Sequence, residues 1–588
     1  MNSLLHIDKL SIDFVSDSSI INAIKNISFS IERGEIMAVV GESGSGKSVT
    51  ALSILQLLPS PPAKYTSGSI LFSENGTDSV DLLRLSIKEI QQIRGNKIGM
   101  IFQEPMSSLN PVFTCGQQVM EAILQHKNVT KQKARELTIA WFAKVKLPHP
   151  ESIFNRYPHQ LSGGQKQRVM ISIAMCCDPA LLICDEPTTA LDVTVQKTIL
   201  ELLKELQKEQ NIGIIFITHD LGVVAEIADR GVVMYKGEIV EQNTIKEIFN
   251  NPQHPYTKGL LACRPVLHPR GKRLPVVSDF MTENAGGKLF EKSQPMPIGS
   301  IVHKGAENKK TIPLSHASSP TIEQTILMKV NNLSVWFASR KHFLSKHPTY
   351  IKAVNDVSFF VYKGETLGLV GESGCGKTTL GRALLRLVEP TSGKILYDGI
   401  DLTAKKRSEL KSLRKKIQIV FQDPYSSLNP RLTIGSAISE PMSVHDMIRT
   451  EKQRKDKVIE LLEKVDLKAD HFSRYPHEFS GGQRQRIVIA RALALKPSFI
   501  VCDESVSALD VSVQAQVLNL LNDLKREFGF TIIFISHDLS IVRYISDRIM
   551  VMEHGKIVET GGADDIYFNP SSEYTKKLIG SIPKGQPS

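Results

Sequence analysis

Two glycine-rich stretches have the composition of loops that bind polyphosphates. G-E-S-G-S-G-K-S occupies residues 41–48, and G-E-S-G-C-G-K-T occupies residues 371–378. Glycines at this spacing let backbone N–H groups converge on a phosphate, and the helix that follows directs its positive end there. The Lys of each stretch is predicted to reach the β- and γ-phosphates, and the final Ser or Thr to bind Mg²⁺. The sequence therefore predicts two nucleotide-binding sites.

An acidic pair ends an apolar run in each half, as L-L-I-C-D-E up to Glu186 and F-I-V-C-D-E up to Glu504. The Asp of each pair is placed to hold Mg²⁺ through water, and the Glu is placed to polarise an attacking water. An isolated Asp-Glu pair is ordinarily a solvated strand end. Its repeated position after the tetrapeptide S-G-G-Q, at 162–165 and 480–483, favours the catalytic interpretation.

A His and a Gln follow two further apolar runs in each half. His219 stands in I-T-H-D and His537 in I-S-H-D, where a His can contact the γ-phosphate and orient the water. Gln103 in F-Q-E-P and Gln422 in F-Q-D-P can contact Mg²⁺ and the water through a neutral amide. A single His or Gln would be an ordinary polar strand end, but the repeated context favours a role at the nucleotide.

The tetrapeptide S-G-G-Q occurs at 162–165 and again at 480–483. Its Ser reads as a helix N-cap, and the Gly pair lets a phosphate approach the backbone closely. Each half already has its own phosphate loop. A second anion-binding helix start in each half therefore needs a second nucleotide or the nucleotide of the other half.

The order of these features shows that a whole domain is duplicated. Corresponding residues are 330 apart for the two lysines, 319 for the two glutamines and 318 for the S-G-G-Q serines, the strand-end aspartates and the histidines. A nearly constant offset is the signature of an internal repeat. We expect a first domain at 1–261, a Pro- and Gly-rich linker at 262–325 and a second domain at 326–588.

The elements that position these residues are predicted to be αβ units. Short continuous apolar runs suit a parallel sheet that is covered on both faces. These predicted strands are Glu35–Val40, Ala180–Cys184, Ile212–Ile217, Glu365–Val370, Ser498–Cys502 and Thr531–Ile535. The amphipathic stretches Val195–Gln210 and Val513–Phe528 supply covering helices, and 111–160 and 430–478 look like inserted helical subdomains.

Composition narrows the class of protein. The chain has 588 residues and a net charge of +11, which suits anionic partners such as lipid headgroups or nucleic acid, although a scattered basic surface explains it equally. It shows no apolar run of membrane-spanning length and no leader, so we expect a soluble or peripheral, cytoplasmic protein. Seven cysteines without a C-x-x-C pair favour reduced core thiols over disulfides or a metal site.

Together these motifs resemble the ATPases of ABC transporters over both halves of the chain. The resemblance implies two P-loop NTPase (ABC ATPase) domains of α/β class, each with a mostly parallel core sheet, an antiparallel β subdomain and an inserted helical subdomain. It also implies head-to-tail pairing, in which each ATP lies between the phosphate loop of one half and the S-G-G-Q of the other. Ala190-Leu191-Asp192 and Ala508-Leu509-Asp510 match the loops that cross this interface in the family.

The residues that the motifs and the resemblance predict to act on ATP and Mg²⁺ fall into three groups. The predicted catalytic residues are Glu186, Glu504, His219, His537, Gln103 and Gln422. The predicted nucleotide-binding residues are Gly41, Glu42, Ser43, Gly44, Ser45, Gly46, Lys47, Ser48, Ser162, Gly163, Gly164, Gln165, Gly371, Glu372, Ser373, Gly374, Cys375, Gly376, Lys377, Thr378, Ser480, Gly481, Gly482 and Gln483. The predicted Mg²⁺ ligands are Ser48, Asp185, Gln103, Thr378, Asp503 and Gln422. For the aromatic side chain that stacks on adenine, Phe14, Phe337 and Tyr350 are all candidates.

A narrower resemblance concerns the ATP-binding subunits of dipeptide, oligopeptide and nickel importers. It rests on S-S-L-N-P at 107–111 and 426–430, R-Y-P-H at 156–159 and 474–477, and the tails H-P-Y-T-K-G-L-L and S-E-Y-T-K-K-L-I. Many such subunits carry a Cys-rich tail, whereas this chain has only Cys263 there, so no iron–sulfur cluster is predicted. Ile173 stands where the second half has Arg491, and Ser505 stands where the first half has Pro187.

The resemblance implies an ATP-hydrolysing, energy-coupling subunit of an importer, most simply for dipeptides or oligopeptides. It implies two integral-membrane permease subunits as partners, an extracytoplasmic solute-binding protein as an indirect partner, and a peripheral place on the cytoplasmic face of the membrane. Nickel and glutathione import remain alternatives, as does export. A different class, a twin-cassette ATPase acting on ribosomes or DNA, is disfavoured by the Pro- and Gly-broken linker and by the absence of Cys clusters, and no nucleic-acid partner is expected.

Overall fold

The computed structural model describes residues 3–16, 19–76, 78–103, 108–189, 191–283, 289–291, 325–338, 350–507, 509–583 and 585. Glu104, Pro105, Ser107, Ala190 and Ala508 of the motifs above lie outside these ranges, as does most of the second half of the expected linker. The chain forms two compact units. Unit 1 comprises 1–261, 277–293 and 583–588, and unit 2 comprises 262–276 and 294–582.

Each unit contains a six-stranded, mostly parallel sheet, as expected. In unit 1 the strand order is β10-β9-β3-β8-β7-β6, and only the β9–β10 pair is antiparallel. The bounds are β10 Glu238–Thr244, β9 Arg230–Tyr235, β3 Ile36–Val40, β8 Gly213–Thr218, β7 Leu181–Asp185 and β6 Ile98–Ile101. In unit 2 the bounds are β22 Lys556–Gly562, β21 Arg548–Glu553, β15 Thr366–Val370, β20 Thr531–Ile535, β19 Phe499–Asp503 and β18 Ile417–Val420.

A four-stranded antiparallel sheet accompanies each large sheet, in the order β2-β1-β4-β5 in unit 1 and β14-β13-β16-β17 in unit 2. In unit 1 the bounds are β2 Ile20–Ile31, β1 Leu5–Val15, β4 Ala63–Phe72 and β5 Val80–Asp81. In unit 2 they are β14 Tyr350–Tyr362, β13 Ile326–Ala338, β16 Ser392–Tyr397 and β17 Ile400–Asp401.

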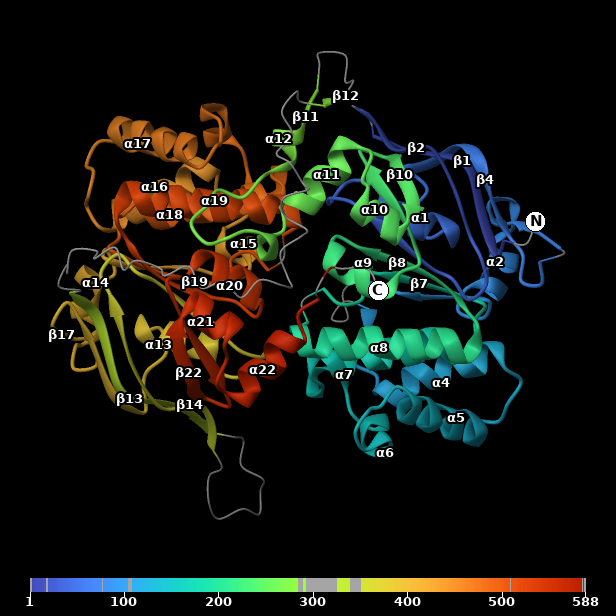
Figure 1. The fold of residues 1–588 in the computed structure, drawn as a ribbon, viewed down its shortest axis with the longest axis horizontal. Helices are drawn as coiled ribbons and strands as arrows, with labels where there is room; N and C mark the ends of the chain where they lie inside the picture. The colour runs from blue at the N-terminus through green and yellow to red at the C-terminus, as the bar shows by residue number, and fades with distance from the viewer. Residues whose placement is uncertain are drawn as a thin grey trace, which may run out of the picture. The chain divides into compact units, whose positions relative to one another are not determined.

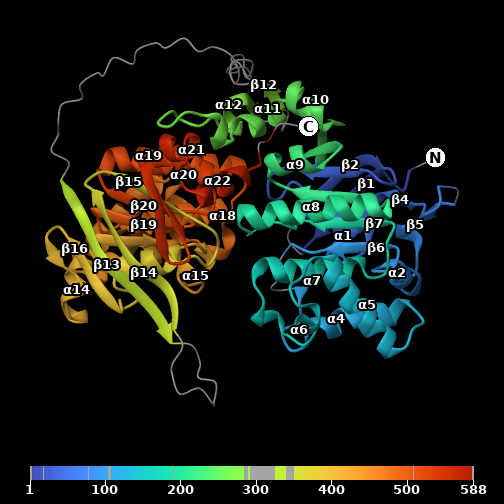
Figure 2. The same cartoon turned by 60° about the horizontal axis from the view of Figure 1, so that its bottom comes forward.

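Most helices of the two units correspond, and Figure 1 shows them by label. In unit 1 they are α1 Lys47–Ile54, α2 Ile87–Ile93, α4 Cys115–His126, α5 Lys131–Lys144, α6 Pro150–Phe154, α7 Gly163–Met175, α8 Val193–Gln210, α9 Leu221–Ile227, α10 Ile245–Asn250 and α11 Pro255–Ala262. In unit 2 they are α13 Lys377–Leu384, α14 Arg407–Leu413, α15 Pro424–Ser427, α16 Ile434–Val444, α17 Glu451–Lys464, α18 Gly481–Leu493, α19 Val511–Phe528, α20 Leu539–Ile545, α21 Ala563–Phe568 and α22 Glu573–Gly580. In unit 1, α4, α5 and α6 pack together beside α7 and away from the antiparallel sheet, which forms the expected helical subdomain (Figure 2).

The core of unit 1 lies on both faces of the parallel sheet, which explains the continuous apolar strands. Leu181 and Ile183 of β7 pack in a cluster with the antiparallel sheet and α1. Leu182 and Cys184, the alternate residues, pack with the helical subdomain and α8. Successive side chains of a strand point to opposite faces, so a strand that is buried on both sides must be apolar throughout. The strand ends, where polarity returns, meet at one edge of the sheet.

The described part of the expected linker is structured. It contains the short helix α12 (Val277–Phe280) and the strands β11 (Met281–Glu283) and β12 (Leu289–Glu291), which pair with each other. Residues 262–276 group with unit 2, although they follow directly on α11 of unit 1. The domain boundaries expected from the sequence stay a prediction. Along the chain, residues 1–261 belong to unit 1, residues 262–276 to unit 2, and residues 277–293 to unit 1 again.

All seven cysteines are buried as reduced thiols. Burial raises the pKa of the Cys184 and Cys502 thiols, which lie in β7 and β19. These two side chains therefore act as small apolar core residues. Among the residues that the structure describes, no helix combines the length and the apolar character needed to cross a membrane.

Candidate functional site

The loop between β3 and α1 has the backbone conformation of a phosphate cradle. Gly41, Gly44 and Gly46 have φ values of 154°, 81° and 104°, which L side chains rarely adopt. A Cβ at Gly41 would lie 2.3 Å from the backbone oxygen of Met234, so only glycine fits. The corresponding loop of unit 2 repeats these angles, with φ 153° at Gly371. Both loops therefore have the shape that the sequence predicts.

The lysine of each loop is buried and bonded to the loop itself. Lys47 Nζ donates to the carbonyl oxygens of Gly41 at 2.7 Å and Glu42 at 2.9 Å. Lys377 Nζ makes the same two bonds, to Gly371 and Glu372, at the same distances. The ammonium group of each lysine is thus held by two backbone carbonyl oxygens of its own loop.

A hydroxyl and a carboxylate meet at the expected metal position of each unit. Ser48 Oγ donates to Asp185 Oδ1 at 3.1 Å, and Thr378 Oγ1 donates to Asp503 Oδ1 at 3.0 Å. Burial raises the pKa of Asp185 to about 6, against the effect of the Ser48 hydrogen bond, and it raises the pKa of Asp503 as well. Paired hard oxygens that leave most positions to phosphate and water are what Mg²⁺ prefers, so these residues fit that ion.

The glutamate after β7 has an unusual backbone conformation. Glu186 has φ 47° and Glu504 has φ 46°, although neither is glycine. Non-glycine residues with positive φ are uncommon and gather at functional sites. The Glu186 N–H donates to Ile217 O at 3.0 Å, and the Glu504 N–H donates to Ile535 O at 2.9 Å, so β8 and β20 hold the bend in place.

Three side chains converge on the carboxylate of Glu186. His219 Nδ1 lies 3.1 Å from Oε1, while Thr189 Oγ1 and Gln103 Nε2 donate to Oε2 at 2.9 and 3.0 Å. Burial by itself would raise the pKa of Glu186, but the hydrogen bond and charge of His219 outweigh it and hold the pKa at about 2. The carboxylate is therefore ionised at neutral pH.

Unit 2 has a looser version of this cluster. Gln422 Nε2 donates to Glu504 Oε2 at 2.8 Å, but His537 Nδ1 is 3.6 Å from Oε1. Ser507 stands where unit 1 has Thr189, and its hydroxyl donates to the backbone oxygen of Glu504 at 3.0 Å rather than to the carboxylate. The pKa of Glu504 is still lowered by His537 against the effect of burial. Both glutamates are thus ionised, with fewer hydrogen bonds to the second.

The S-G-G-Q segments begin α7 and α18 as full capping boxes. Ser162 Oγ accepts from the Gln165 N–H at 3.3 Å, and Gln165 Oε1 accepts from the Ser162 N–H at 3.1 Å. The second glycine has a further reason to be glycine, since a Cβ at Gly164 would lie 2.6 Å from Val195 of α8. Ser480 and Gln483 repeat the capping box in unit 2. The pairing of each segment with the loop of the other half stays a prediction.

The strand register bears on the adenine-stacking candidates. Phe14 of β1 pairs with Ile21 of β2, and Phe337 of β13 pairs with Ile351 of β14, so these two Phe residues occupy corresponding places. Tyr350 instead pairs with Ala338 and corresponds to Ile20. Phe337 is 44% exposed. Of the three candidates, Phe14 and Phe337 therefore offer an aromatic ring at the same position in both units.

The structure adds functional candidates that the motifs did not include. Thr189 is one, and the tyrosines of the two tail segments are the others. Tyr256 of α11 accepts a hydrogen bond from the Glu42 N–H at 3.0 Å, and Tyr574 of α22 accepts one from the Glu372 N–H at 3.0 Å. The two tyrosines are 318 residues apart, the same offset as the S-G-G-Q serines, and this was the signal in the sequence.

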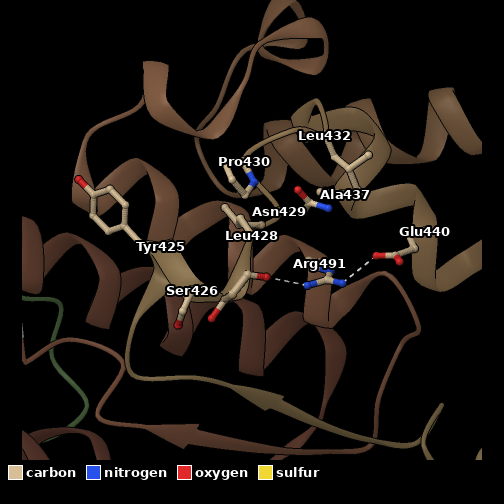
Figure 3. Close-up of a pocket in the computed structure, with 10 residues that line it drawn as sticks. Tyr425, Ser426, Leu428, Asn429, Pro430, Leu432, Ala437, Glu440 and Arg491 are labelled. Carbon is tan, nitrogen blue, oxygen red and sulfur yellow. Dashed lines mark hydrogen bonds and ion pairs between the residues drawn. The ribbon is translucent and has the colours of Figure 1, made fainter.

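A pocket of about 420 Å³ opens beside the S-S-L-N-P segment of unit 2 (Figure 3). Its lining residues are Tyr425, Ser426, Ser427, Leu428, Asn429, Pro430, Leu432, Ala437, Glu440 and Arg491. Arg491 donates to Ser427 O and to Glu440 Oε2, each at 2.8 Å, and so joins the segment to α16. The position of Arg491 is Ile173 in unit 1, so unit 1 lacks this link.

The glycine-rich loops, strand-end carboxylates and S-G-G-Q helices define an ABC ATPase, and the chain belongs to the ABC transporter family. The model of that family, described as ABC transporter, matches residues 24–189 and 354–507. A second model, described as the oligopeptide/dipeptide transporter C-terminal region, matches residues 240–293 and 558–588. The chain is therefore an ATP-binding, ATP-hydrolysing subunit of an ABC importer, built of two cassettes.

Among known proteins, the chain is similar to the glutathione import ATP-binding protein GsiA of several bacteria. It is 47% identical to that of Shigella dysenteriae serotype 1 (strain Sd197) over 586 residues, which is 100% of this chain and 90% of the relative. It is 46% identical to that of Escherichia coli (strain K12) over the same shares. A solved dimeric cassette, MJ0796 bound to ADP and Pi, is 28% identical with a TM-score of 0.37, covering 40% of this chain and 98% of that one.

Proposed function

We propose that this chain drives the uptake of glutathione and related short peptides by hydrolysing ATP. The observation that carries the proposal is the 47% identity to a glutathione import ATP-binding protein along the whole chain, both cassettes and the intervening segment included. Glutathione is itself a short peptide, so the oligopeptide/dipeptide match of both tail regions agrees with it. The solute-specific contacts would lie in the permease and in a solute-binding protein rather than in this chain.

At each site the chain's own side chains perform separate tasks. Lys47 and Lys377 would neutralise the β- and γ-phosphates. The hydroxyl and carboxylate pairs Ser48–Asp185 and Thr378–Asp503 would hold Mg²⁺, which supplies charge stabilisation to the leaving phosphates. Glu186 and Glu504 would accept the proton of the attacking water.

His219 and His537 keep these carboxylates ionised. Gln103 and Gln422 orient them through a hydrogen bond to each. Each S-G-G-Q helix start would close over the γ-phosphate bound by the opposite half. Shifting such a closure from 1:99 to 99:1 takes about 5.5 kcal/mol of differential binding. A few charge-assisted hydrogen bonds at each of two sites suffice for that.

The partners follow from the same function. Two integral-membrane permease subunits would receive the motion, with the pocket around Tyr425, Leu432 and Arg491 as the docking place in unit 2. The chain would then sit peripherally on the cytoplasmic face of the membrane. An extracytoplasmic solute-binding protein would be an indirect partner, through the permease alone.

The test is uptake by cells that carry the intact chain with its permease, or the chain with both Lys47→Ala and Lys377→Ala. We expect labelled glutathione to enter with the intact chain and not with the double variant. Labelled dipeptides, longer peptides and nickel are measured in parallel. If nickel alone depends on the two lysines, the glutathione assignment is wrong; if none of the solutes does, the importer assignment itself is overturned.

A further inference from the structure

The tail helix of each unit reaches the phosphate loop through one tyrosine hydroxyl. Tyr256 is completely buried, and its hydroxyl accepts the Glu42 N–H at 3.0 Å, across 214 residues of sequence. Tyr574 accepts the Glu372 N–H at the same distance. Burial raises the pKa of the Tyr574 phenol, so the hydroxyl stays protonated at every physiological pH. The same contact therefore occurs in both units.

The residue that each tyrosine holds lies at the entrance of the loop. Glu42 follows Gly41 directly, and its carbonyl oxygen is one of the two acceptors of Lys47. The Glu42 backbone is thereby fixed on both sides, with its N–H held by Tyr256 and its C=O by Lys47. A lysine that moves to a bound phosphate would give up its bonds to the loop. The tyrosine bond would then still hold the N–H of this residue, while its carbonyl oxygen still accepts the Ser45 N–H at 3.0 Å.

The tail helices are themselves pinned to the large sheets. Glu241 of β10 accepts the N–H groups of Gln253 and His254 at 2.9 and 3.0 Å, just before α11. Glu559 of β22 accepts those of Ser571 and Ser572 at 2.7 and 3.2 Å, just before α22. The tyrosine therefore projects from a helix whose start cannot shift freely. This is the arrangement that a rigid positioning contact requires.

We propose that Tyr256 and Tyr574 are positioning residues that keep the two phosphate loops in their nucleotide-binding shape. The tail region thus belongs functionally to the ATP sites rather than being an appendage to them. The inference rests on the proposed binding of ATP phosphates by these loops. It predicts an effect on nucleotide affinity, because the loop's shape is needed before any chemistry begins.

The experiment compares Tyr256→Phe and Tyr574→Phe, singly and together, in the full chain. Loss of one neutral, part-buried hydrogen bond is expected to raise the KM for ATP about fivefold at the altered site, with kcat unchanged. A nonhydrolysable ATP analogue should show one weakened site in each single variant and two in the double variant. Tyr235→Phe is the matched control, since the Tyr235 ring lies 4.4 Å from that of Tyr256 but its hydroxyl has no part in the proposal.

The outcomes separate two failures. If Lys47→Ala leaves ATP affinity unchanged, the proposed phosphate-loop function is wrong. If Lys47→Ala weakens binding while the folded double Tyr→Phe variant keeps its KM and affinity, the positioning inference is overturned. A lowered melting temperature with unchanged affinity also overturns it, because that result makes the contact a purely structural one.

A second inference rests on the arm, defined as residues 262–276, which follows α11 but groups with unit 2. Asn519, 3% exposed in the middle of α19, donates its amide to Leu274 O and accepts from the Leu274 N–H, both at 2.9 Å. Tyr544 of α20 donates its hydroxyl to Lys272 O at 2.7 Å. A buried amide that is satisfied on both sides by one backbone residue marks a specific docking contact.

The two polar side chains that bond the arm, Asn519 and Tyr544, have no equivalent residue type in the first cassette. Asn519 and Tyr544 stand where unit 1 has Glu201 and Glu226, at the 318-residue offset. Glu201 is exposed. The ion pairs Arg270–Asp547 and Arg273–Asp523 also join the arm to unit 2, but their side chains are 40% to 70% exposed and such pairs contribute little. The specificity of the contact therefore rests on the two buried polar side chains.

We infer that the arm ties the first cassette to the second without help from ATP. A protease site inserted between residues 300 and 320, outside the described ranges, would cut the full chain between the cassettes. We expect the two fragments to stay together without nucleotide, and Asn519→Asp with Tyr544→Phe to weaken their association at least tenfold. Glu201→Gln is the matched control and should change nothing.

Circular dichroism and nucleotide binding of each fragment verify that the variants are folded, and Tyr544→Phe alone provides a milder change. Separation of the wild-type fragments in the absence of nucleotide would overturn the inference. Equal affinity of wild-type and doubly substituted fragments would overturn it as well. Because the readout needs no ATP and no solute, it is independent of the proposed transport function.

Discussion

His219 Nδ1 lies 3.1 Å from Glu186 Oε1, whereas His537 Nδ1 lies 3.6 Å from Glu504 Oε1. The two sites share their residue types but differ in how closely the base is held. The sites also differ at a second position, where the Thr189 hydroxyl bonds the carboxylate of Glu186 and the Ser507 hydroxyl bonds the backbone oxygen of Glu504. The glutamate carboxylate of unit 1 is therefore held by more and shorter contacts than that of unit 2, and both glutamates are ionised.

Replacing the glutamate with its neutral isostere tests the proposed base. Glu186→Gln or Glu504→Gln should lower turnover at its own site by about 10²-fold or more, since an amide accepts no proton from water. ATP binding should persist, because the phosphate loop is untouched. Single-turnover hydrolysis and equilibrium nucleotide binding measure the two effects. Full ATPase activity in the doubly substituted chain would remove these residues from the catalytic role.

The hydroxyl next to each glutamate gives a comparison within the chain. Thr189→Val removes a 2.9 Å bond to the Glu186 carboxylate at nearly constant volume and should slow hydrolysis about three- to tenfold. Ser507→Ala removes a bond to a backbone oxygen and should leave the rate of the second site nearly unchanged. Rates are measured with the opposite site inactivated by Glu→Gln. Equal effects of the two substitutions would contradict the difference described here.

The two glycines of S-G-G-Q should differ in their effect on stability. Gly164→Ala puts a Cβ 2.6 Å from Val195, and overpacking of this kind costs about 1–3 kcal/mol. At Gly163 the nearest atom belongs to Leu191, 3.5 Å away, so Gly163→Ala fits. Thermal unfolding of the two variants, compared with the unaltered chain, measures the difference. The expectation is wrong if Gly163→Ala proves the more destabilising change.

The anchor of α22 should depend on pH. Burial alone would raise the pKa of Glu559, but its hydrogen bonds with Ser571 and other groups at the helix start lower it. A carboxylate with a lowered folded-state pKa adds stability above its unfolded-state pKa, near 4.5, and that stability is lost as pH falls through the folded-state value. Glu559→Gln should therefore loosen α22 at pH 7 and have progressively less effect below about pH 4.5.

Hydrogen exchange of the α22 amides, expressed as the ratio of variant to wild type at each pH, measures this effect. The ratio removes the intrinsic pH dependence of exchange. Asp564→Asn is a suitable control, because that side chain pairs with Arg543 on a neighbouring helix instead. A ratio that stays constant from pH 7 to pH 4 would argue against a role for the charge.

Much of the fold could be predicted because its strands are buried on both faces. The continuous apolar run before Asp185 predicts a strand at Ala180–Cys184, and β7 spans Leu181–Asp185, one residue further along the chain. The convergence of Gln103, Glu186 and His219 followed from the parallel sheet, whose strand ends share one edge. The roles assigned to these residues stay predictions that the experiments above can test.

Other features depend on contacts that no local pattern reveals. The bond from Glu42 to Tyr256 joins residues 214 apart, and its tyrosine resembles any aromatic on an amphipathic helix. The positive φ of Glu186 is imposed by its hydrogen bond to Ile217 on the next strand. Asn519 interrupts an apolar helix face, but only the docked backbone of Leu274 explains why it is tolerated there.

The arm also makes the order of the two cassettes along the chain matter. The two cassettes are repeats, yet Asn519 and Tyr544, which bond the arm, are replaced by Glu201 and Glu226 in the first, and the arm itself is the continuation of the first cassette. If the order of the cassettes were exchanged, the arm would lie at a chain terminus. The buried side-chain amide of Asn519 in α19 would then lose the Leu274 backbone groups that it bonds. Once duplication had been followed by these substitutions, the order of the halves along the gene could no longer be reversed without cost.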